Sequence, residues 1–276
     1  MAALYVVPTP IGNMSDMTER AKEVLAMCDF VAAEDTRVGG KLLMLLGIKK
    51  PLVSCHEHTP AIIVQKIAER IIGGESCALI TDAGTPAVSD PGEKLVAECA
   101  ARGIRICALP GACAAVTALS ASGLNSRRFC FEGFLPDSKS ERAERIGELR
   151  REKRTFIIYL SPHDIESYLE ELCEPFGDRK CVLAKEITKI HERYFRGTLS
   201  QVAAEFGALP DQDKRGEYLL VCEGMASDDE FWKELTVSQH VERYMALGLS
   251  KMDACKQAAR DRGVGKSEIY AEVSKQ

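Results

Sequence analysis

Three loops of the chain combine proline, glycine and small side chains in a way that suits ligand binding. They cover residues 8–13 (Pro-Thr-Pro-Ile-Gly-Asn), 82–86 (Asp-Ala-Gly-Thr-Pro, with Ser-Asp-Pro-Gly at 89–92) and 110–115 (Pro-Gly-Ala-Cys-Ala-Ala). Proline restricts the backbone, glycine allows close approach, and a helix that opens with small residues leaves its N–H groups accessible to a ligand. One such loop is more often an ordinary turn, but three together favour a ligand-binding cleft.

The loops lack the two common nucleotide-binding signatures. The sequence contains neither Gly-x-x-x-x-Gly-Lys-Ser/Thr nor Gly-x-Gly-x-x-Gly. A P-loop nucleotidase and an ordinary dinucleotide-binding domain are therefore disfavoured.

Two histidines, His56 and His58, lie two residues apart after a predicted strand. This spacing can place both side chains on one face of a strand, yet two ligands are too few to hold a metal ion. We expect a loop that faces the substrate rather than plain surface, and we expect no metal site.

The first 124 residues alternate buried strands with helical patterns, which positions the three loops. Strands are predicted at residues 4–7, 30–33, 52–55, 78–81 and 104–109, and helices at 18–27, 37–46, 62–72, 93–101 and 112–121. Such alternation predicts a parallel sheet covered by helices. The loops after residues 7, 81 and 109 would then meet at the carboxyl edge of this sheet, where ligands bind in such folds.

The remaining chain divides into two further predicted domains. Residues 125–226 contain strands at 129–134, 156–160, 181–185, 193–195 and 218–222, with hairpin-compatible spacing that predicts a mixed sheet in a second α/β domain. Residues 227–276 open with a polar linker at 228–230. Three short helices that resemble a helix-turn-helix module follow, with Ser250 capping the second.

Composition indicates a globular cytoplasmic protein. Hydrophobic residues make up 46% of the chain and charged residues 28%. No apolar run is long enough for a membrane helix, and the start lacks a basic signal-peptide region. The eleven cysteines include no Cys-x-x-Cys pair and stand mostly among aliphatic residues, so we interpret them as reduced core residues.

Charge alone does not indicate a nucleic-acid partner. The net charge is −5, and the most basic stretch, residues 139–154, holds seven Lys or Arg against four Glu. This pattern is more typical of a solvated helix face with ion pairs than of an RNA-binding surface, although both remain open.

The loop sequences, taken in order, resemble the tetrapyrrole-methylase superfamily and, within it, the 16S rRNA cytidine 2′-O-methyltransferases. The resemblance also covers Ala-Glu-Asp-Thr-Arg at 33–37, Leu-Pro-Gly at 109–111 and Arg-Phe-Cys-Phe-Glu-Gly-Phe-Leu-Pro at 128–136. It continues with Ala-Lys-Glu-Ile-Thr-Lys at 184–189, Arg-Gly-Thr-Leu at 196–199 and Lys-Arg-Gly-Glu at 214–217. These matches extend in order over residues 4–224.

The resemblance implies two α/β domains of the tetrapyrrole-methylase type, S-adenosylmethionine held between them, and a homodimer acting on a cytidine of 16S rRNA in the small ribosomal subunit. It also implies which residues bind the cofactor. These are Pro10, Asp82, Ala83, Gly84, Thr85, Val88, Ser89, Gly111, Ala112, Phe131, Tyr159, Leu160, Gly216 and Glu217.

The chain departs from the family pattern mainly in one segment. The family has Tyr-Glu-Ser-Pro-His-Arg where residues 159–164 are Tyr-Leu-Ser-Pro-His-Asp, so Leu160 replaces a glutamate and Asp164 an arginine. The change removes an expected ion pair or RNA contact.

A ribose hydroxyl is a poor acid, so its methylation calls for a base or for a cation that stabilises developing negative charge. By residue type, the candidates are Lys185, Glu186 and Lys189, together with the pair Glu34 and Asp35. Glu34, Asp35 and Arg37, with His56 and His58, are expected on the substrate side. Alternatively, the 34–37 acids cap a helix, and Lys185 and Glu186 form a strand-end ion pair.

Two other functions remain open. One is methylation of a tetrapyrrole ring, the substrate of other superfamily members; the basic segment at 139–154 and the helical tail argue against it. The other is an RNA-binding assembly factor that retains a cofactor cleft without catalysis.

Overall fold

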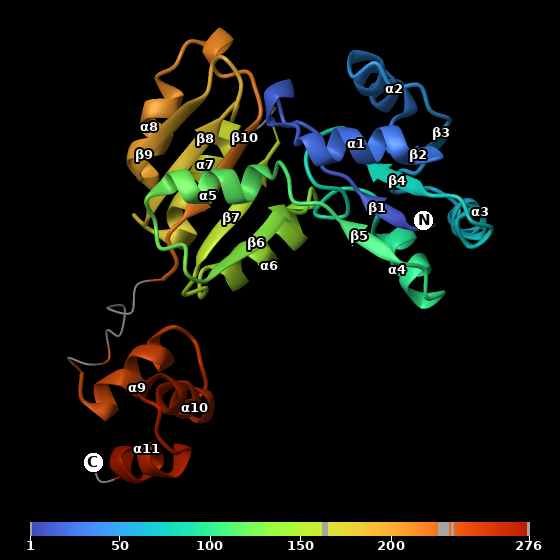
Figure 1. Ribbon diagram of the computed structural model, residues 1–276. Coiled ribbons are helices and arrows are strands. Elements are labelled where there is room, and N and C mark those ends of the chain that lie inside the picture. Colours follow the sequence, from blue (N-terminus) through green and yellow to red (C-terminus); the bar gives the residue numbers. More distant parts are fainter. Residues whose placement is uncertain (1, 162–164, 226–231, 233–234, 275–276) are drawn as a thin grey trace. The chain divides into compact units, whose positions relative to one another are not determined.

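The computed structural model describes residues 2–161, 165–225, 232 and 235–274. The chain forms two compact units, Met1–Gly224 and Met225–Gln276. Figure 1 shows two sheets with their helices in the first unit and helices alone in the second. The expected linker at 228–230 and the family departure at Asp164 lie outside the described residues.

The first sheet is parallel, as predicted. Its strands follow the order β3-β2-β4-β1-β5, and every neighbouring pair in it is parallel. The strands are β1 (Leu4–Val6), β2 (Phe30–Ala33), β3 (Leu52–Ser54), β4 (Cys77–Ile80) and β5 (Ile106–Ala108). Because β1 and β4 are inner strands, the loops that follow them begin near the middle of the sheet's carboxyl edge.

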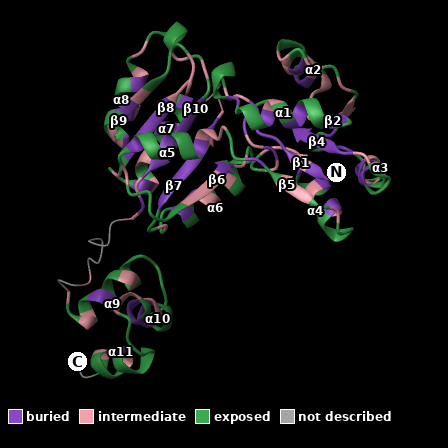
Figure 2. Ribbon diagram, in the orientation of Figure 1, coloured by how far each residue is buried: buried purple, intermediate pink, exposed green. Residues whose placement is uncertain are grey.

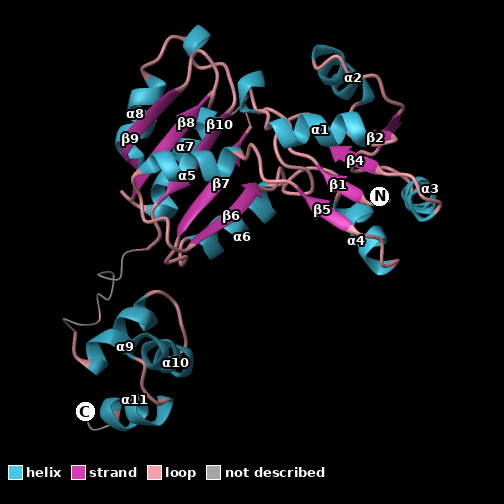
Figure 3. Cartoon of the chain, viewed as in Figure 1, coloured by secondary structure: helices cyan, strands magenta, loops and turns pink. Residues whose placement is uncertain are grey.

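Helices cover both faces of this sheet (Figure 3). Leu4 and Val6 point to the face packed by α3 and α4, whereas Tyr5 points to the face packed by α1 and α2, as strand alternation requires. The helices are α1 (Glu19–Met27), α2 (Thr36–Leu45), α3 (Ala61–Ile72) and α4 (Glu93–Ala101).

The second sheet is mixed, also as predicted. Its order is β6-β7-β10-β8-β9; β6 and β7 are parallel, and the other neighbours are antiparallel. The strands are β6 (Phe129–Phe134), β7 (Thr155–Leu160), β8 (Lys180–Lys185), β9 (Arg193–Thr198) and β10 (Tyr218–Cys222). All five residues of β10 are buried, as Figure 2 shows for the central strands of both sheets.

The second sheet also has two covered faces. Helices α6 (Lys139–Leu149), α7 (Ile165–Phe176) and α8 (Leu199–Gly207) pack on one face, and α5 (Ala114–Ser122) packs on the other. Helix α5 precedes the boundary expected at residue 124, yet its Ala118 and Leu119 contact the second sheet. The division into domains 1–124, 125–226 and 227–276 therefore stays a prediction.

The second unit contains the helical tail with its helix-turn-helix-like pattern. It comprises α9 (Val237–Ala246), α10 (Lys251–Arg262) and α11 (Lys266–Val273) around a small core that includes Val241 and Ala258. Ser250 caps α10 as predicted, since its side chain accepts a hydrogen bond from the Asp253 N–H.

The basic segment at 139–154 forms α6 and the turn after it, where arginines pair with glutamates. Arg142 lies 2.9 Å from Glu171, Arg145 contacts Glu132 and Glu148, and Arg154 lies 2.8 Å from Glu152. These pairs favour the ion-paired helix face over an RNA-binding surface for the three arginines.

The cysteines are all free, and seven of the eleven are buried. Burial raises the pKa of Cys28 to about 11 and that of Cys181 to about 12, and it raises the pKa of Cys77 and Cys222 well above the ordinary value. Thiols in this state react slowly, because the thiolate is the reactive form.

We therefore expect a thiol reagent at pH 8 to modify at most the four partly exposed cysteines of the folded protein: Cys107, Cys113, Cys130 and Cys173. In denaturant all eleven should react. Mass spectrometry of the labelled protein measures the number of modified cysteines in the folded and in the denatured protein. Rapid labelling of Cys77 or Cys222 without denaturant would contradict the prediction.

Candidate active site

The three loops identified in the sequence converge at the carboxyl edge of the first sheet. Thr9 and Gly84 exchange two backbone hydrogen bonds, of 2.9 and 3.1 Å, which join the first loop to the second. The Thr85 hydroxyl donates to the Ala112 carbonyl at 2.8 Å, which joins the second loop to the third. The expectation that these loops share one edge is confirmed.

Glycine is required where the first and third loops touch. A Cβ at Gly111 would lie 2.5 Å from the Pro8 Cβ and 2.8 Å from its Cγ, closer than real Cβ atoms approach. Any other residue at 111 would therefore push the two loops apart.

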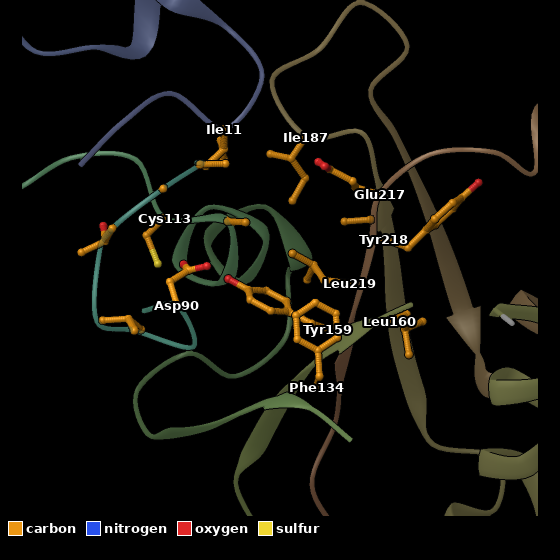
Figure 4. Close-up of a pocket in the computed structure, with 16 residues that line it drawn as sticks. Ile11, Asp90, Cys113, Phe134, Tyr159, Leu160, Ile187, Glu217, Tyr218 and Leu219 are labelled. Carbon is orange, nitrogen blue, oxygen red and sulfur yellow. The ribbon is translucent and has the colours of Figure 1, made fainter. Parts of the chain in front are cut away.

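A cavity of about 310 Å³ lies between these loops and the second sheet (Figure 4). Of the predicted cofactor-binding residues, seven line it: Ala83, Gly84, Thr85, Val88, Tyr159, Leu160 and Glu217. The phenyl ring of Phe134 at the rim is 58% exposed and stands 5.3 Å from the Tyr159 ring. The cavity thus combines loop backbone, apolar walls and aromatic rings.

The other predicted cofactor-binding residues lie around the cavity rather than on its wall. Pro10 and Asp82 line a neighbouring cleft, and Ser89 lines a second cavity. Gly111 and Ala112 support the loops, as described above. The Phe131 ring packs 5.1 Å from the Tyr159 ring, and Gly216 packs against Glu186.

Nine lining residues were not among the individually predicted cofactor-binding residues: Ile11, Asp90, Cys113, Ala114, Phe134, Ala184, Ile187, Tyr218 and Leu219. Ile11, Asp90, Cys113 and Ala114 lie within the predicted loops, whereas the other five lie at or near strand ends of the second sheet. The apolar residues among the nine look like core positions in sequence. Asp90 is the exception, because a carboxylate within a Gly/Pro loop that follows a strand is a recognisable signal.

None of the three predicted catalytic residues lines the cavity, although Lys189 and Glu186 contact Glu217, which does. The Lys189 ammonium lies 2.9 Å from both the Glu186 and the Glu217 carboxylates. The Glu186 carboxylate also accepts a 2.7 Å hydrogen bond from the Glu217 N–H. Lys185 donates to the Asp213 carbonyl. The predicted Lys185–Glu186 ion pair is absent among the described contacts, because Glu186 pairs with Lys189 instead.

Replacing Lys189 with methionine should leave two adjacent carboxylates without their shared cation. We expect the 186–189 turn and the Glu217 backbone to loosen, with a loss of roughly 1 kcal/mol in stability. Thermal unfolding measures this, with Lys22→Met as the matched control, since Lys22 makes only an exposed i,i+3 pair with Glu19. Equal unfolding temperatures for the two variants would contradict the role assigned to Lys189.

The acidic segment at 34–37 begins α2, in agreement with the alternative that these acids cap a helix. The Asp35 side chain accepts from the Arg37 guanidinium and from the Arg37 backbone N–H, the latter at 2.7 Å. These hydrogen bonds, the side-chain ones first, lower the pKa of Asp35 to about 2. Glu34 accepts from the Thr81 hydroxyl at 2.6 Å and from the Asp82 N–H at 3.3 Å. Their placement on the substrate side stays a prediction.

His56 lies on the wall of the second cavity, which has a volume of about 250 Å³. The His58 N–H donates to His56 Nδ1 at 3.1 Å, so this ring atom is already satisfied within the loop. In the part of the chain that the structure describes, no three His, Cys, Asp or Glu side chains form a metal-binding group.

Asp90 projects into the first cavity opposite the Tyr159 ring (Figure 4). Burial, together with the negative charges of Glu34 and Asp82, raises the pKa of Asp90 to about 6. Burial likewise raises the pKa of Tyr159 to about 12. Asp90 therefore changes charge close to neutral pH.

Four non-glycine residues with positive φ flank the cavity. They are Ala87 (φ 64°), Ser89 (φ 62°), Glu186 (φ 50°) and Thr188 (φ 66°). This conformation costs an L-residue roughly 1–3 kcal/mol and persists where surrounding structure enforces it, as at binding sites. The loops of both sheets are thus held in uncommon conformations beside the cavity.

The chain matches the family of tetrapyrrole (corrin/porphyrin) methylases over residues 3–203. No helix among the described residues has the length and apolar character to cross a membrane.

Curated relatives extend the similarity over nearly the whole chain. The ribosomal RNA small subunit methyltransferase I of Bacillus subtilis (strain 168) is 42% identical over 275 residues, covering 98% of this chain and 93% of the relative. The protein of the same name from Escherichia coli O157:H7 is 40% identical over 269 residues, covering 97% and 93%.

Solved structures show the same fold at low sequence identity. The methyltransferase CobJ aligns with a TM-score of 0.60 and 16% identity, covering 82% of this chain and 95% of CobJ. The uroporphyrin-III C-methyl transferase from Thermus thermophilus, solved with S-adenyl homocysteine, aligns with a TM-score of 0.54 and 17% identity, covering 80% and 97%.

Proposed function

Because the chain belongs to the tetrapyrrole methylases and, within them, to the ribosomal RNA small subunit methyltransferase I proteins, we propose that it is an S-adenosylmethionine-dependent methyltransferase of 16S rRNA. More narrowly, we propose that it methylates the ribose 2′-hydroxyl of a cytidine. The observation that carries the proposal is the cavity formed where three Gly/Pro loops converge, in a chain similar to these relatives over 98% of its length.

The residues of the cavity suit S-adenosylmethionine. Gly84 and Thr85 present loop backbone, the Phe134 and Tyr159 rings offer stacking faces for an adenine, and Glu217 supplies a carboxylate toward a cationic ligand. When bound, the donor supplies a methyl group already activated by a positively charged sulfur. The protein's own task is to orient the acceptor hydroxyl and to receive its proton.

We propose that the acceptor approaches from the side of the second cavity. His56 lies on its wall. The predicted substrate-side residues Glu34, Asp35 and His58 lie in the loops after β2 and β3, and Arg37 lies in the first turn of α2. We further propose that the protein works as a homodimer in the cytoplasm, as the small ribosomal subunit is its substrate.

The test uses the purified full chain with methyl-labelled S-adenosylmethionine and small ribosomal subunits from a strain deleted for this gene. We expect label in 16S rRNA, and nucleoside mass spectrometry should place it on a cytidine ribose. Light scattering of the same preparation measures the oligomeric state.

Three outcomes would contradict the proposal. Label on a base would refute the ribose assignment. Label in a uroporphyrinogen- or precorrin-type acceptor, and not in rRNA, would favour tetrapyrrole methylation. Calorimetric binding of the donor with no transfer to any acceptor would favour an assembly factor that only retains the cleft.

A further inference from the structure

Asp90 stands between the two cavities. It lines the first cavity, and it also lines the second, which is formed by the 55–59 loop, the 87–92 loop and the start of α4. Among the described residues it is the one that both cavities share. Groups bound in the two cavities would therefore both lie beside Asp90.

The loop that carries Asp90 is held from several sides. The Ala87 N–H donates to the Pro91 carbonyl at 3.2 Å, which closes a tight turn around residues 88–90. A Cβ at Gly133 would lie 2.6 Å from the Ser89 Oγ, so β6 packs directly on this loop. A Cβ at Gly92 would lie 2.8 Å from the Leu79 side chain of β4, so contacts with both sheets hold the loop that carries the carboxylate.

Glu217 and Lys185, two charged residues at or near the first cavity, are already engaged. Glu217 is the second carboxylate on its wall, and Lys189 holds it at 2.9 Å, together with Glu186. The Lys185 ammonium bonds the Asp213 carbonyl. In the described structure Asp90 has no hydrogen-bond or ion-pair partner, so its oxygens remain available to an acceptor group.

On the basis of the proposed function, we propose that Asp90 is the catalytic base, which accepts the proton of the acceptor hydroxyl. The acceptor ribose occupies the second cavity and the methyl donor occupies the first. The oxygen–methyl bond forms as the sulfur–methyl bond breaks, the bonding pair stays on sulfur, and the hydroxyl proton passes to the Asp90 carboxylate.

The charges around Asp90 suit this role. Burial, and then the charges of Glu34 after β2 and Asp82 after β4, disfavour the ionised form of Asp90 and together raise its pKa to about 6. Tyr159 from β7 and Cys113 before α5 face it across the first cavity. Around the second cavity stand His56, Glu57, Glu93 and Lys94. A base with this pKa is mostly ionised at pH 7.5 and is a stronger base than an ordinary carboxylate.

The test compares the full-length wild type with Asp90→Asn and Asp90→Glu. Under single-turnover conditions with small ribosomal subunits, we expect the asparagine variant to lose at least 100-fold in methyl-transfer rate, the range typical of a general base. Its calorimetric affinity for S-adenosylhomocysteine should stay within threefold of wild type. The glutamate variant should recover part of the rate. The methyl-transfer rate of wild type should decrease as the pH is lowered through about 6, and the rate of the asparagine variant should not show this decrease.

A stability measurement gives a readout that is independent of activity. Because folding raises the pKa of Asp90, the folded protein binds this proton more tightly than the unfolded chain does, and the resulting stabilisation is lost as the pH rises through about 6. The melting temperature of wild type should therefore fall relative to Asp90→Asn between pH 4 and pH 7. Glu23→Gln, an exposed carboxylate on α1 outside both cavities, is the matched control and should behave as wild type.

The outcomes separate this inference from the proposed function. A wild type that transfers no methyl group to rRNA refutes the function. An active wild type with an equally active Asp90→Asn overturns the role of Asp90. Loss of S-adenosylhomocysteine affinity that matches the loss of rate also overturns it, because Asp90 would then bind the donor rather than the acceptor proton.

Discussion

Replacing Gly111 with alanine should weaken donor binding by at least tenfold, measured by calorimetry with S-adenosylhomocysteine. The added Cβ would lie 2.5 Å from the Pro8 Cβ, and a proline ring has little freedom to move away. Relief of the clash must therefore separate the first and third loops, which place Ile11 and Cys113 on the cavity wall. The effect on binding should exceed the effect on stability, because the clash lies at the loops and not in the core.

The matched control is Gly147→Ala in α6. A Cβ at Gly147 meets no described atom within 4 Å, and alanine is the better helix former by about 1 kcal/mol. This variant should bind the donor as wild type does and should be slightly more stable. If Gly111→Ala bound the donor within twofold of wild type, contact between the first and third loops would not be required for binding.

Replacing Phe156 with alanine should produce the largest loss of stability, about 3–5 kcal/mol. Phe156 lies on β7, is fully buried, and its ring stands 5.2 Å from the Phe176 ring of α7 at an angle of 65°. The truncation would leave a cavity between the second sheet and its helices. Urea unfolding, monitored by a spectroscopic signal of the first unit, measures the effect as a lower urea concentration at the unfolding midpoint.

Phe134→Ala provides the comparison, because the same substitution is made at a side chain that is 58% exposed. It should leave the unfolding midpoint nearly unchanged yet weaken donor binding, since this ring stands at the rim of the cavity. Similar midpoints for the two alanine variants would show that β7 does not carry the core contacts described here.

Much of the architecture could be predicted from local patterns. The alternation of short buried strands with helical periods predicted a parallel first sheet, and hairpin spacing predicted a mixed second sheet; both predictions are confirmed. Boundaries were less accurate. The helix expected from residue 112 begins at Ala114, because residues before it stay extended to reach Pro8 and Thr85.

The candidate site was predicted only in part, because its side chains are arranged by tertiary contacts. That the loops at 8–13, 82–86 and 110–115 meet follows from strand direction alone. The pairing of Lys189 with Glu217 could not be predicted in this way, since the two residues belong to different loops of the second sheet. Similarly, nothing in the local pattern around Ala118 indicates that α5 packs on the second sheet rather than the first.

Strand β10 is the last strand of the second sheet to be synthesised, yet it occupies the middle position between β7 and β8. A nascent chain that has reached only β9 therefore carries two unpaired strand edges and an open apolar surface, a state prone to aggregation. A premature stop codon before residue 218 would remove the strand that joins the two halves of this sheet. A stop codon just after Gly224 would still leave every strand of both sheets encoded.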